Sequence, residues 1–343
     1  MPFSKFLTIT FLSFILWTCG GTGTDKTNFS IHTDAEKNTV HYGSSIRLSL
    51  KNPKKLDVTS VTYYFNGKEV TESFEVLSKL GEQTVTATVN YGDVSEEITA
   101  KIIVLNNEPP KIYSYKIINE YPHDIKSYTQ GLEFHNGELY ESTGQYGESK
   151  LRKVDYKTGE VLKNIDLTNQ YFGEGLTILG DKLYQLTWRE NTGFIYDVNT
   201  FEKTGSFKYG KSKEGWGLCN DGTSLYKSDG TDKIWTLDTN DFTEKDHIQV
   251  YTNNGKIPSL NELEWIDGKI FANIYQRNGV VIINPKSGAV EGVIDFSPLK
   301  EKVTQHRELD VLNGIAYNPN TKTIFVTGKD WDKLFEVEVY VQD

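Results

Sequence analysis

Hydrophobic and polar residues alternate in short runs along the first third of the chain, and turn residues separate these runs. The runs cover four segments, 45–50, 60–65, 83–89 and 98–104, with Gly67 and Gly92 at turns between them. Alternation with a period of two and many β-branched side chains are typical of strands that bury one face. The pattern predicts a small β-sandwich of immunoglobulin-like type over residues 29–105, with a spacer or protein-contact role. The Asn and Pro residues at 106–110 predict a stiff linker over 106–111.

From residue 112 onward the alternation becomes part of a longer repeat. Five segments each contain a polar or aromatic residue, then Gly or Glu, then Leu or Ile, and a hydrophobic pair follows each of them. The segments begin at Gln130, Glu174, Trp216, Asn261 and Asn313, at spacings of 44, 42, 45 and 52 residues. A unit of this size accommodates four short strands, which is the size of one propeller blade. The repeat therefore predicts a five-bladed β-propeller over residues 112–343.

The strand count also predicts how such a ring closes. The last unit, 313–340, has room for three strands, and a strand-like run at 112–120 precedes the first unit. Pairing that early run with the last three strands would complete the fifth blade and leave no open edge. A solenoid of stacked β units is the alternative, and it would need atypical capping repeats at both ends. We therefore expect an all-β protein in which a small sandwich precedes a closed propeller.

Charge and motif content restrict the class of function. The 343 residues include 47 acidic and 37 basic side chains, a formal net charge of −10, without a long basic run. This balance argues against nucleic acid as a partner, because binding to a phosphate backbone rests on clustered Lys and Arg. The six His lack metal-ligand spacing, and the chain has no nucleophile elbow, phosphate-binding loop, dinucleotide fingerprint or EF-hand loop. We therefore expect neither a metal nor a cofactor.

The start of the chain has the pattern of an export signal. Residues 1–18 contain a single cation, Lys5, followed by an apolar stretch over 6–17. The sequence Leu16, Trp17, Thr18, Cys19 resembles a bacterial lipobox, so Cys19 would carry lipid and residues 19–28 would form a flexible tether. We expect a cell-envelope lipoprotein of the periplasm or outer membrane that meets the membrane only through its anchor. The alternative is an ordinary secretory signal with an incidental cysteine.

The repeat also predicts where a site would lie. Equivalent residues on the inner strands of a propeller face the central channel, so the five residues that begin the repeats should form a ring at one mouth. The second strand contributes a second set: Gly144, Trp188, Gly230, Tyr275 and Lys329. These residues differ from unit to unit, as one asymmetric ligand would require, and they predict an enclosed pocket with a few separate polar groups. Each also has a structural interpretation, in which Glu174 is a salt-bridged channel carboxylate, the tryptophans are core residues, and Lys329 covers an aromatic face.

Consecutive motifs in this region resemble one enzyme family. They are YPHD at 121–124, YTQGL at 128–132, LYESTGQYG at 139–147, YFGEGL at 171–176, LTW at 186–188, EGWGL at 214–218, LNELE at 260–264, ANI at 272–274, LNGIA at 312–316 and TGK at 327–329. In this order they resemble the plant-type and bacterial glutaminyl-peptide cyclotransferases, the glutamine cyclotransferase family. The resemblance spans 113–339, leaves the predicted sandwich outside, and independently implies a five-bladed propeller.

The resemblance implies that the N-terminal glutaminyl residue of a peptide or protein is converted to 5-oxoproline with release of ammonia, by metal-free acid/base chemistry. Glu174 matches the proposed acid/base residue of the family. Lys329 and Asn261 match polar pocket positions, and with Glu174 they are the catalytic residues that the resemblance implies. The substrate-binding positions implied are Tyr128, Gln130, Phe172, Trp188, Trp216 and Tyr275. Tyr275 stands where the family commonly has Trp, so this wall stays aromatic but gains a hydroxyl. We expect the protein to act as a monomer.

Two other functions remain open at this point. A non-enzymatic surface propeller that binds peptide N-termini or glycans would need the aromatic residues, but not Glu174 together with Lys329. A propeller hydrolase or lactonase usually needs a metal-binding set of carboxylates and Asn, whereas the predicted ring supplies one carboxylate.

Overall fold

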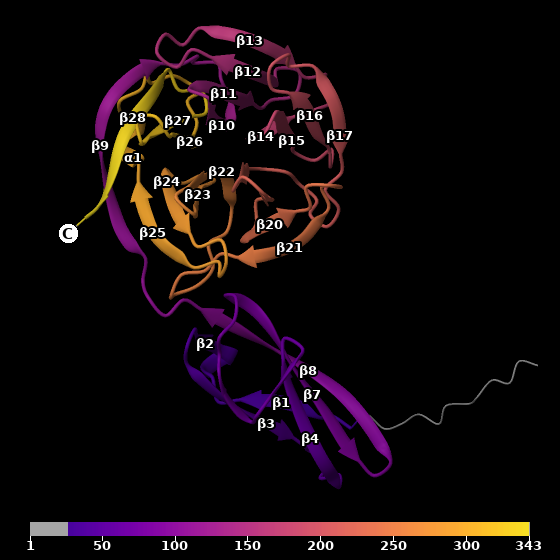
Figure 1. The fold of residues 1–343 in the computed structure, drawn as a ribbon. Helices are drawn as coiled ribbons and strands as arrows, with labels where there is room; N and C mark the ends of the chain where they lie inside the picture. The colour runs from indigo at the N-terminus through magenta and orange to yellow at the C-terminus, as the bar shows by residue number, and fades with distance from the viewer. Residues whose placement is uncertain (1–26, 343) are drawn as a thin grey trace, which may run out of the picture.

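The computed structural model describes residues 27–342, and within them the protein is built almost entirely from β-strands (Figure 1). The helical elements are a short 3₁₀ turn, η1 (Glu36–Asn38), and one short helix, α1 (Ser297–Lys300). The all-β prediction is confirmed. No helix in this part of the chain is long and apolar enough to cross a membrane. The predicted signal at 1–18, the lipidation of Cys19 and most of the tether lie outside the described residues.

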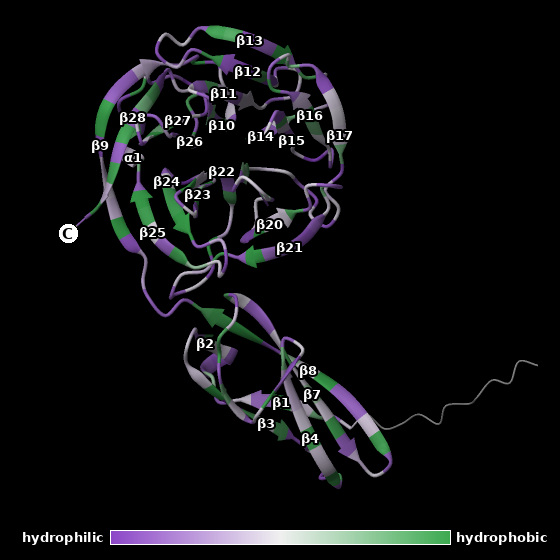
Figure 2. Cartoon of the chain, viewed as in Figure 1, coloured by the Kyte–Doolittle hydropathy of each residue, from purple (hydrophilic) through white to green (hydrophobic). Residues whose placement is uncertain are grey.

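The N-terminal region contains two sheets that pack on one core. One sheet has the strand order β1 (Ser30–Thr33), β3 (Ser45–Lys51), β6 (Ser73–Glu75). The other has the order β2 (Thr39–His41), β8 (Val94–Leu105), β7 (Gly81–Tyr91), β4 (Val58–Phe65), β5 (Lys68–Val70). Alternate residues such as Val85, Ala87 and Val89 are buried, and hydrophobic and hydrophilic bands follow each other along β8 (Figure 2). Strand β2 pairs parallel with β8, while the other pairs are antiparallel.

Three antiparallel four-stranded sheets follow along the chain. The first comprises β10 (Thr129–His135), β11 (Glu138–Thr143), β12 (Lys150–Val154) and β13 (Val161–Asp166). The second comprises β14 (Gly173–Leu179), β15 (Lys182–Thr187), β16 (Gly193–Asp197) and β17 (Lys203–Phe207). The third comprises β18 (Leu218–Asn220), β19 (Leu225–Ser228), β20 (Lys233–Leu237) and β21 (Glu244–Gln249). Figure 1 shows the sheets arranged around a centre, with β10 and β14 inside and β13 and β17 outside.

An eight-stranded sheet completes the ring. Its first half is β22 (Leu260–Ile266), β23 (Lys269–Ile274), β24 (Gly279–Ile283) and β25 (Val290–Asp295). Its second half is β9 (Lys111–Pro122), β28 (Lys333–Val341), β27 (Thr323–Gly328) and β26 (Leu312–Asn318). Strand β9 pairs antiparallel with β28, as expected for the run at 112–120. It also pairs parallel with β25 near Lys111, a contact that the strand pattern did not indicate.

Glycines in the repeat allow neighbouring inner strands to approach. A Cβ atom on Gly131 would lie 2.5 Å from the backbone nitrogen of Leu176, and one on Gly175 would lie 2.5 Å from that of Leu218. On Gly217 it would lie 2.1 Å from the backbone oxygen of Asn261. Real Cβ atoms do not approach backbone this closely, so these positions require glycine. The recurring Gly therefore allows the inner strands to pack closely at the centre of the ring of sheets, which we call the hub.

The N-terminal region also contacts the ring. Tyr251 and Ala289, which belong to the ring, are buried in the core of the N-terminal sheets. The backbone nitrogen of Leu80 donates to the backbone oxygen of Ser287 at 2.9 Å, and that of Glu82 donates to Oε1 of Gln249 at 2.8 Å. The two regions therefore meet in a partly apolar, hydrogen-bonded contact.

Candidate active site

A cavity of about 180 Å³ lies where the inner strands meet. Its walls are formed by Tyr128, Gln130, Gln145, Phe172, Glu174, Trp188, Trp216, Asn261, Tyr275 and Lys329. The structure thus places all nine site residues named from the sequence around one space. Gln145 is the additional wall, and its backbone has a φ of +86°. A larger open groove of about 700 Å³ adjoins the cavity through Tyr275, and Pro258, Arg277 and Asp295 also line it.

Irregular strand starts direct the inner residues toward the cavity. The pairing register of β10 with β11 shifts between Thr129 and Gly131, leaving Gln130 unpaired. Shifts of the same kind occur between Gly173 and Leu176 and between Leu260 and Leu263, which frame Glu174 and Asn261. Bulges bend a strand and change the direction of its side chains. The side chains of the pocket residues therefore do not follow the regular alternation between the two faces of the sheet. Trp216 precedes β18 and reaches the cavity from a loop.

Gly144 and Gly230 of the second predicted set serve packing. The prediction that residues of this set differ because they contact one ligand is therefore corrected for these two positions. A Cβ atom on Gly144 would lie 2.4 Å from Cε1 of Phe172, and one on Gly230 would lie 2.6 Å from Cε2 of Trp216. These positions lack a side chain because an aromatic ring from an adjacent segment fills the space. Asn313 likewise lies outside the cavity lining, and its Nδ2 donates to Oε1 of Gln130 at 3.2 Å. That bond orients the Gln130 amide.

Glu174 is a buried carboxylate in the wall, with 3% of its surface exposed. Its Oε2 atom has no hydrogen-bond partner among the described residues. Burial raises the pKa of Glu174 well above its usual range, because the charged form loses solvation. The ammonium of Lys329 and the amide of Gln130 oppose this shift, while the charges of Glu214 and Glu190 reinforce it. A carboxyl group with such a pKa can exchange a proton at working pH.

Lys329 is buried beside the same space, with 2% of its surface exposed. Its Nζ atom lies 4.5 Å from the ring centroid of Tyr128 and 5.2 Å from that of Tyr275. Burial lowers the pKa of Lys329, and the charges of Glu174 and Asp310 oppose the shift. Lys329 therefore does cover aromatic faces, but those faces are walls of the cavity.

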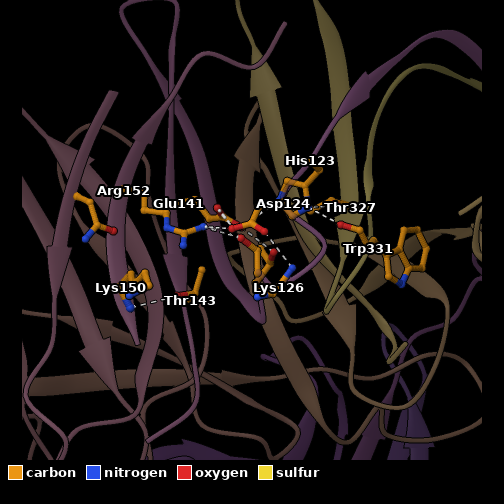
Figure 3. Close-up of polar contacts among 12 residues, drawn as sticks. His123, Asp124, Lys126, Glu141, Thr143, Lys150, Arg152, Thr327 and Trp331 are labelled. Carbon is orange, nitrogen blue, oxygen red and sulfur yellow. Dashed lines mark hydrogen bonds and ion pairs between the residues drawn. The ribbon is translucent and has the colours of Figure 1, made fainter. Parts of the chain in front are cut away.

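The turn that carries Lys329 is fixed by a polar cluster at the join between β9 and the first sheet (Figure 3). Nδ1 of His123 contacts the backbone oxygen of Trp331 at 2.7 Å, and its Nε2 contacts Oε1 of Glu141 at 3.0 Å. Burial acts to lower the pKa of His123, but Glu141 outweighs it and the pKa is raised. Arg152 donates to Asp124 in the same cluster at 2.9 Å. These contacts hold the backbone that positions Lys329.

Aromatic rings form the remaining walls and pack against one another. The rings of Phe172 and Trp188 lie 5.5 Å apart, and those of Trp216 and Tyr275 lie 5.4 Å apart at 89°. The hydroxyl of Tyr128 donates to Oδ2 of Asp310 at 3.1 Å. The tilted contact of Phe172 with Trp188 and the edge-to-face contact of Trp216 with Tyr275 hold the orientation of these rings. The cavity therefore has rigid apolar sides and a few fixed polar groups.

Sequence reasoning missed three residues that line or support the site. Gln145 lines the cavity, Asp310 accepts from Tyr128, and Glu214 accepts from both Trp188 and Trp216. Glu214 stands two residues before Trp216 within the EGWGL motif at 214–218, but neither signal says that its side chain accepts from the two indoles. Within residues 27–342, no group of three or more His, Cys, Asp or Glu side chains could hold a metal ion.

Comparison with known proteins agrees with this geometry. The family model described as glutamine cyclotransferase matches residues 85–339, so the match begins inside β7 and extends into the predicted sandwich. Glutaminyl-peptide cyclotransferase of Arabidopsis thaliana is 42% identical over 234 residues, which cover 67% of this chain and 72% of the relative. The crystal structure of Myxococcus xanthus glutaminyl cyclase superposes with a TM-score of 0.64 at 38% identity, covering 68% of this chain and all of that one. The chain belongs to the glutamine cyclotransferase family.

Proposed function

We propose that this protein is a glutaminyl-peptide cyclotransferase, which converts the N-terminal glutaminyl residue of peptides or proteins to 5-oxoproline and releases ammonia. The observation that carries the proposal is the cavity itself, in which buried Glu174 lies among aromatic walls with Lys329 and Asn261. Membership of the glutamine cyclotransferase family supports the same reaction. A surface that only bound peptide ends or glycans would not need a buried acid beside a buried lysine.

The walls provide the first requirement of the reaction, which is conformation. The α-amine must reach the side-chain carboxamide of the same residue, so the glutaminyl side chain has to fold back on itself. The rigid rings of Phe172, Trp188 and Trp216 bound a space that favours such a compact conformer over an extended one. The open groove that shares Tyr275 with the cavity would hold the rest of the peptide chain.

Glu174 provides the proton transfers. The amine nitrogen forms a bond to the carboxamide carbon, and the bond from that carbon to the side-chain nitrogen breaks. As a carboxylate, Glu174 takes a proton from the attacking amine and then gives it to the departing nitrogen, which leaves as ammonia. The negative charge that develops on the carboxamide oxygen needs nearby donors. As a set, Lys329, Asn261 and Gln130 bind three groups of the substrate, which are this oxygen, the amine and the backbone carbonyl.

Glu174→Gln tests this assignment because it keeps the shape of the side chain and removes its proton chemistry. We expect turnover of a Gln-initiated dipeptide, measured as ammonia release, to fall by about 10²-fold or more. Binding of the dipeptide should change much less. A variant with near-normal turnover would reject Glu174 as the proton carrier, and absence of ammonia from the unmodified protein would reject the function itself.

We also propose the domain arrangement that these sheets suggest. The three four-stranded sheets and the two halves of the eight-stranded sheet would be five propeller blades over 112–343, with β9 closing the ring. The two sheets before them would form an immunoglobulin-like sandwich over 29–105, joined by the linker 106–111. The shared cores between neighbouring sheets support the blade assignment.

The cellular location is a proposal from the sequence alone. The lipobox-like Leu16–Cys19 segment supports export and lipidation at Cys19. The full chain, expressed in a bacterium, should partition into the detergent phase, and Cys19→Ser should move it to the aqueous phase. Equal partitioning of both would favour an ordinary secretory signal.

A further inference from the structure

Glu214 lies behind the cavity wall and joins two of its aromatic rings. Its Oε2 atom accepts a hydrogen bond from Nε1 of Trp188 and another from Nε1 of Trp216, each at 2.9 Å. Trp188 follows β15 and Trp216 precedes β18, so the two indoles come from different sheets. Each indole has one N–H donor, and both use it on this one oxygen. The carboxylate therefore fixes two walls with respect to each other.

Glu214 is itself held in place. Nε of Arg189 donates to its Oε1 at 3.1 Å, and the guanidinium of Arg189 lies 3.7 Å from the ring centroid of Trp188. The backbone oxygen of Glu214 accepts from the buried Nζ of Lys227 at 2.9 Å. Both ends of the residue are thus anchored, which makes it a rigid support for the indoles.

The charge of Glu214 also acts on the cavity. Burial acts to raise the pKa of Glu214, but hydrogen bonds from Trp216, Trp188 and Arg189 outweigh it and hold the pKa below its usual range. The residue is therefore ionised at neutral pH. The charges that act on Glu174 are those of Lys329, Glu190 and Glu214, and the two carboxylates among them favour its protonated form. The hydroxyl groups of Tyr128, Tyr146 and Tyr209 also interact with its charge.

We propose that Glu214 is a positioning residue for the cyclisation, whose carboxylate joins the two indole walls and sets their spacing. The proposal rests on the proposed function, since it assigns Glu214 to the site of that reaction. The two indole bonds carry the proposal, and the effect of the Glu214 charge on Glu174 is a separate consequence that the same variants test.

Three variants separate the geometric role from the effect of the charge. Glu214→Gln keeps an oxygen that accepts from both indoles but removes the charge. Glu190→Gln removes another charge that acts on Glu174. It leaves both indole bonds intact, because these bonds go to Glu214 and Glu190 accepts from the hydroxyl of Tyr146. Glu214→Leu removes both the charge and the acceptor. The readouts are the indole N–H resonances of protein labelled with ¹⁵N-tryptophan, assigned with Trp188→Phe and Trp216→Phe, and the pH dependence of kcat on a Gln-initiated dipeptide.

We expect Glu214→Leu to shift the Trp188 and Trp216 resonances together and to lower kcat/KM by about tenfold or more, because the walls lose their spacing. Glu214→Gln and Glu190→Gln should both move the Glu174-dependent limb of the kcat profile to lower pH. Glu190→Gln should leave the two indole resonances in place. Should Glu214→Leu fail to fold, Glu214→Gln still tests the geometry, because exchanging the charged acceptor for a neutral amide should shift both indole resonances together.

One result would overturn the proposal, namely a Glu214→Leu or Glu214→Gln spectrum in which only one of the two resonances moves, or neither. A Glu214→Gln pH profile that superposes on that of the unmodified protein would contradict the effect of the charge on Glu174. If the unmodified protein released no ammonia, the proposed function would fail, while the spectra would still report whether Glu214 joins the indoles.

Discussion

Glu174 and Lys329 occupy the same cavity, and burial opposes the charge on each of them. Each stabilises the charged form of the other, and Oε2 of Glu174 has no hydrogen-bond partner among the described residues. A substrate that brings an amine and a carboxamide between them would meet one group able to carry a proton and one able to face an oxyanion. At this scale the site works through two buried ionisable groups that line one cavity.

Lys329→Met probes both effects of the ammonium. Turnover should fall by about 10²-fold, because a donor to the developing oxyanion is lost. Lys329 also lowers the pKa of Glu174, so its removal should raise that pKa further and move the Glu174-dependent limb of the kcat profile to higher pH. Kinetics of dipeptide turnover across pH 5–9 check this. A limb that moves to lower pH would contradict the electrostatic role.

Gly144→Ala tests whether glycine at this position shapes the cavity. The new methyl group would lie 2.4 Å from the ring of Phe172, so the ring must shift and the wall moves with it. We expect kcat/KM for the dipeptide to fall by about tenfold or more. Gly210→Ala is the matched control, because nothing lies within 4 Å of its Cβ position, and it should retain full activity. Equal activity of the two variants would show that Phe172 yields freely.

At the scale of elements, the inner strands are joined by side chains that accept backbone hydrogen bonds across sheets. Glu133 of β10 accepts from the backbone nitrogen of Ile178 in β14 at 3.0 Å, and Glu264 of β22 accepts from that of Tyr317 in β26 at 2.8 Å. These bonds replace the ladder contacts that adjacent sheets cannot make with each other. Hydrogen bonds to acidic side chains and the close approach of glycine backbones therefore both hold the inner strands of the hub together.

The side chain of Lys227 holds the loop that leads into β18 in place. Its side chain is fully buried and contacts Oε1 of Glu244 at 3.1 Å, Oγ of Ser212 at 2.5 Å and the backbone oxygen of Glu214. Lys227→Met leaves Glu244 as an unpaired buried charge, which costs about 3–5 kcal/mol. Urea unfolding should show this loss. Lys245→Met is the control, because it removes an exposed partner of Asp238 and should lower the free energy of unfolding by about 1 kcal/mol or less. If both variants lost this small amount, the buried pair of Lys227 and Glu244 would not stabilise the fold.

At the scale of the whole molecule, closure by β9 joins the N-terminal region to the last sheet. The strand pairs with β28 over most of its length and with β25 at its start, so it connects the two halves of the eight-stranded sheet. The acidic groups of the hub are the half-buried Glu133 and the buried Glu262 and Glu264, and they come from strands of both sides of the ring. Their titration should therefore report on the stability of the whole ring.

Stability should fall as the pH rises through neutrality. Burial raises the pKa of Glu133 to about 7 and those of Glu262 and Glu264 well above their usual range. An acid with a higher pKa in the folded than in the unfolded chain binds more protons when folded, so its contribution is present at low pH and is lost as the pH passes its folded pKa. The thermal midpoint should drop between pH 6 and pH 8.5.

Glu133→Gln should make that drop smaller, since a neutral amide can still accept from Ile178. Glu138→Gln, at a partly buried pair with Lys153, is the control and should leave the drop unchanged. A midpoint that rises with pH in the unmodified protein would contradict the assignment of these groups.

Much of the architecture follows from local patterns. The alternation at 45–50 and 83–89 predicts strands that the structure contains as β3 and β7, because burying one face of a strand requires every second residue to be apolar. The repeat beginning at Gln130 located the inner strands, and the family resemblance named the residues of the pocket. The residues of the pocket can therefore be predicted from the sequence where a motif recurs and one position within it differs from unit to unit.

The sequence by itself determined the all-β fold, the repeat and the set of unlike residues that begin each inner strand, since strand periodicity and repeat spacing are local properties. The tertiary structure alone decided which residues support that set. Glu214 became the common acceptor of two indoles, Gly144 and Gly230 became spaces for aromatic rings, and Asn313 became the partner of Gln130. The physical reason is that these contacts join different sheets, and local sequence carries no record of which distant side chain fills a space or completes a hydrogen bond.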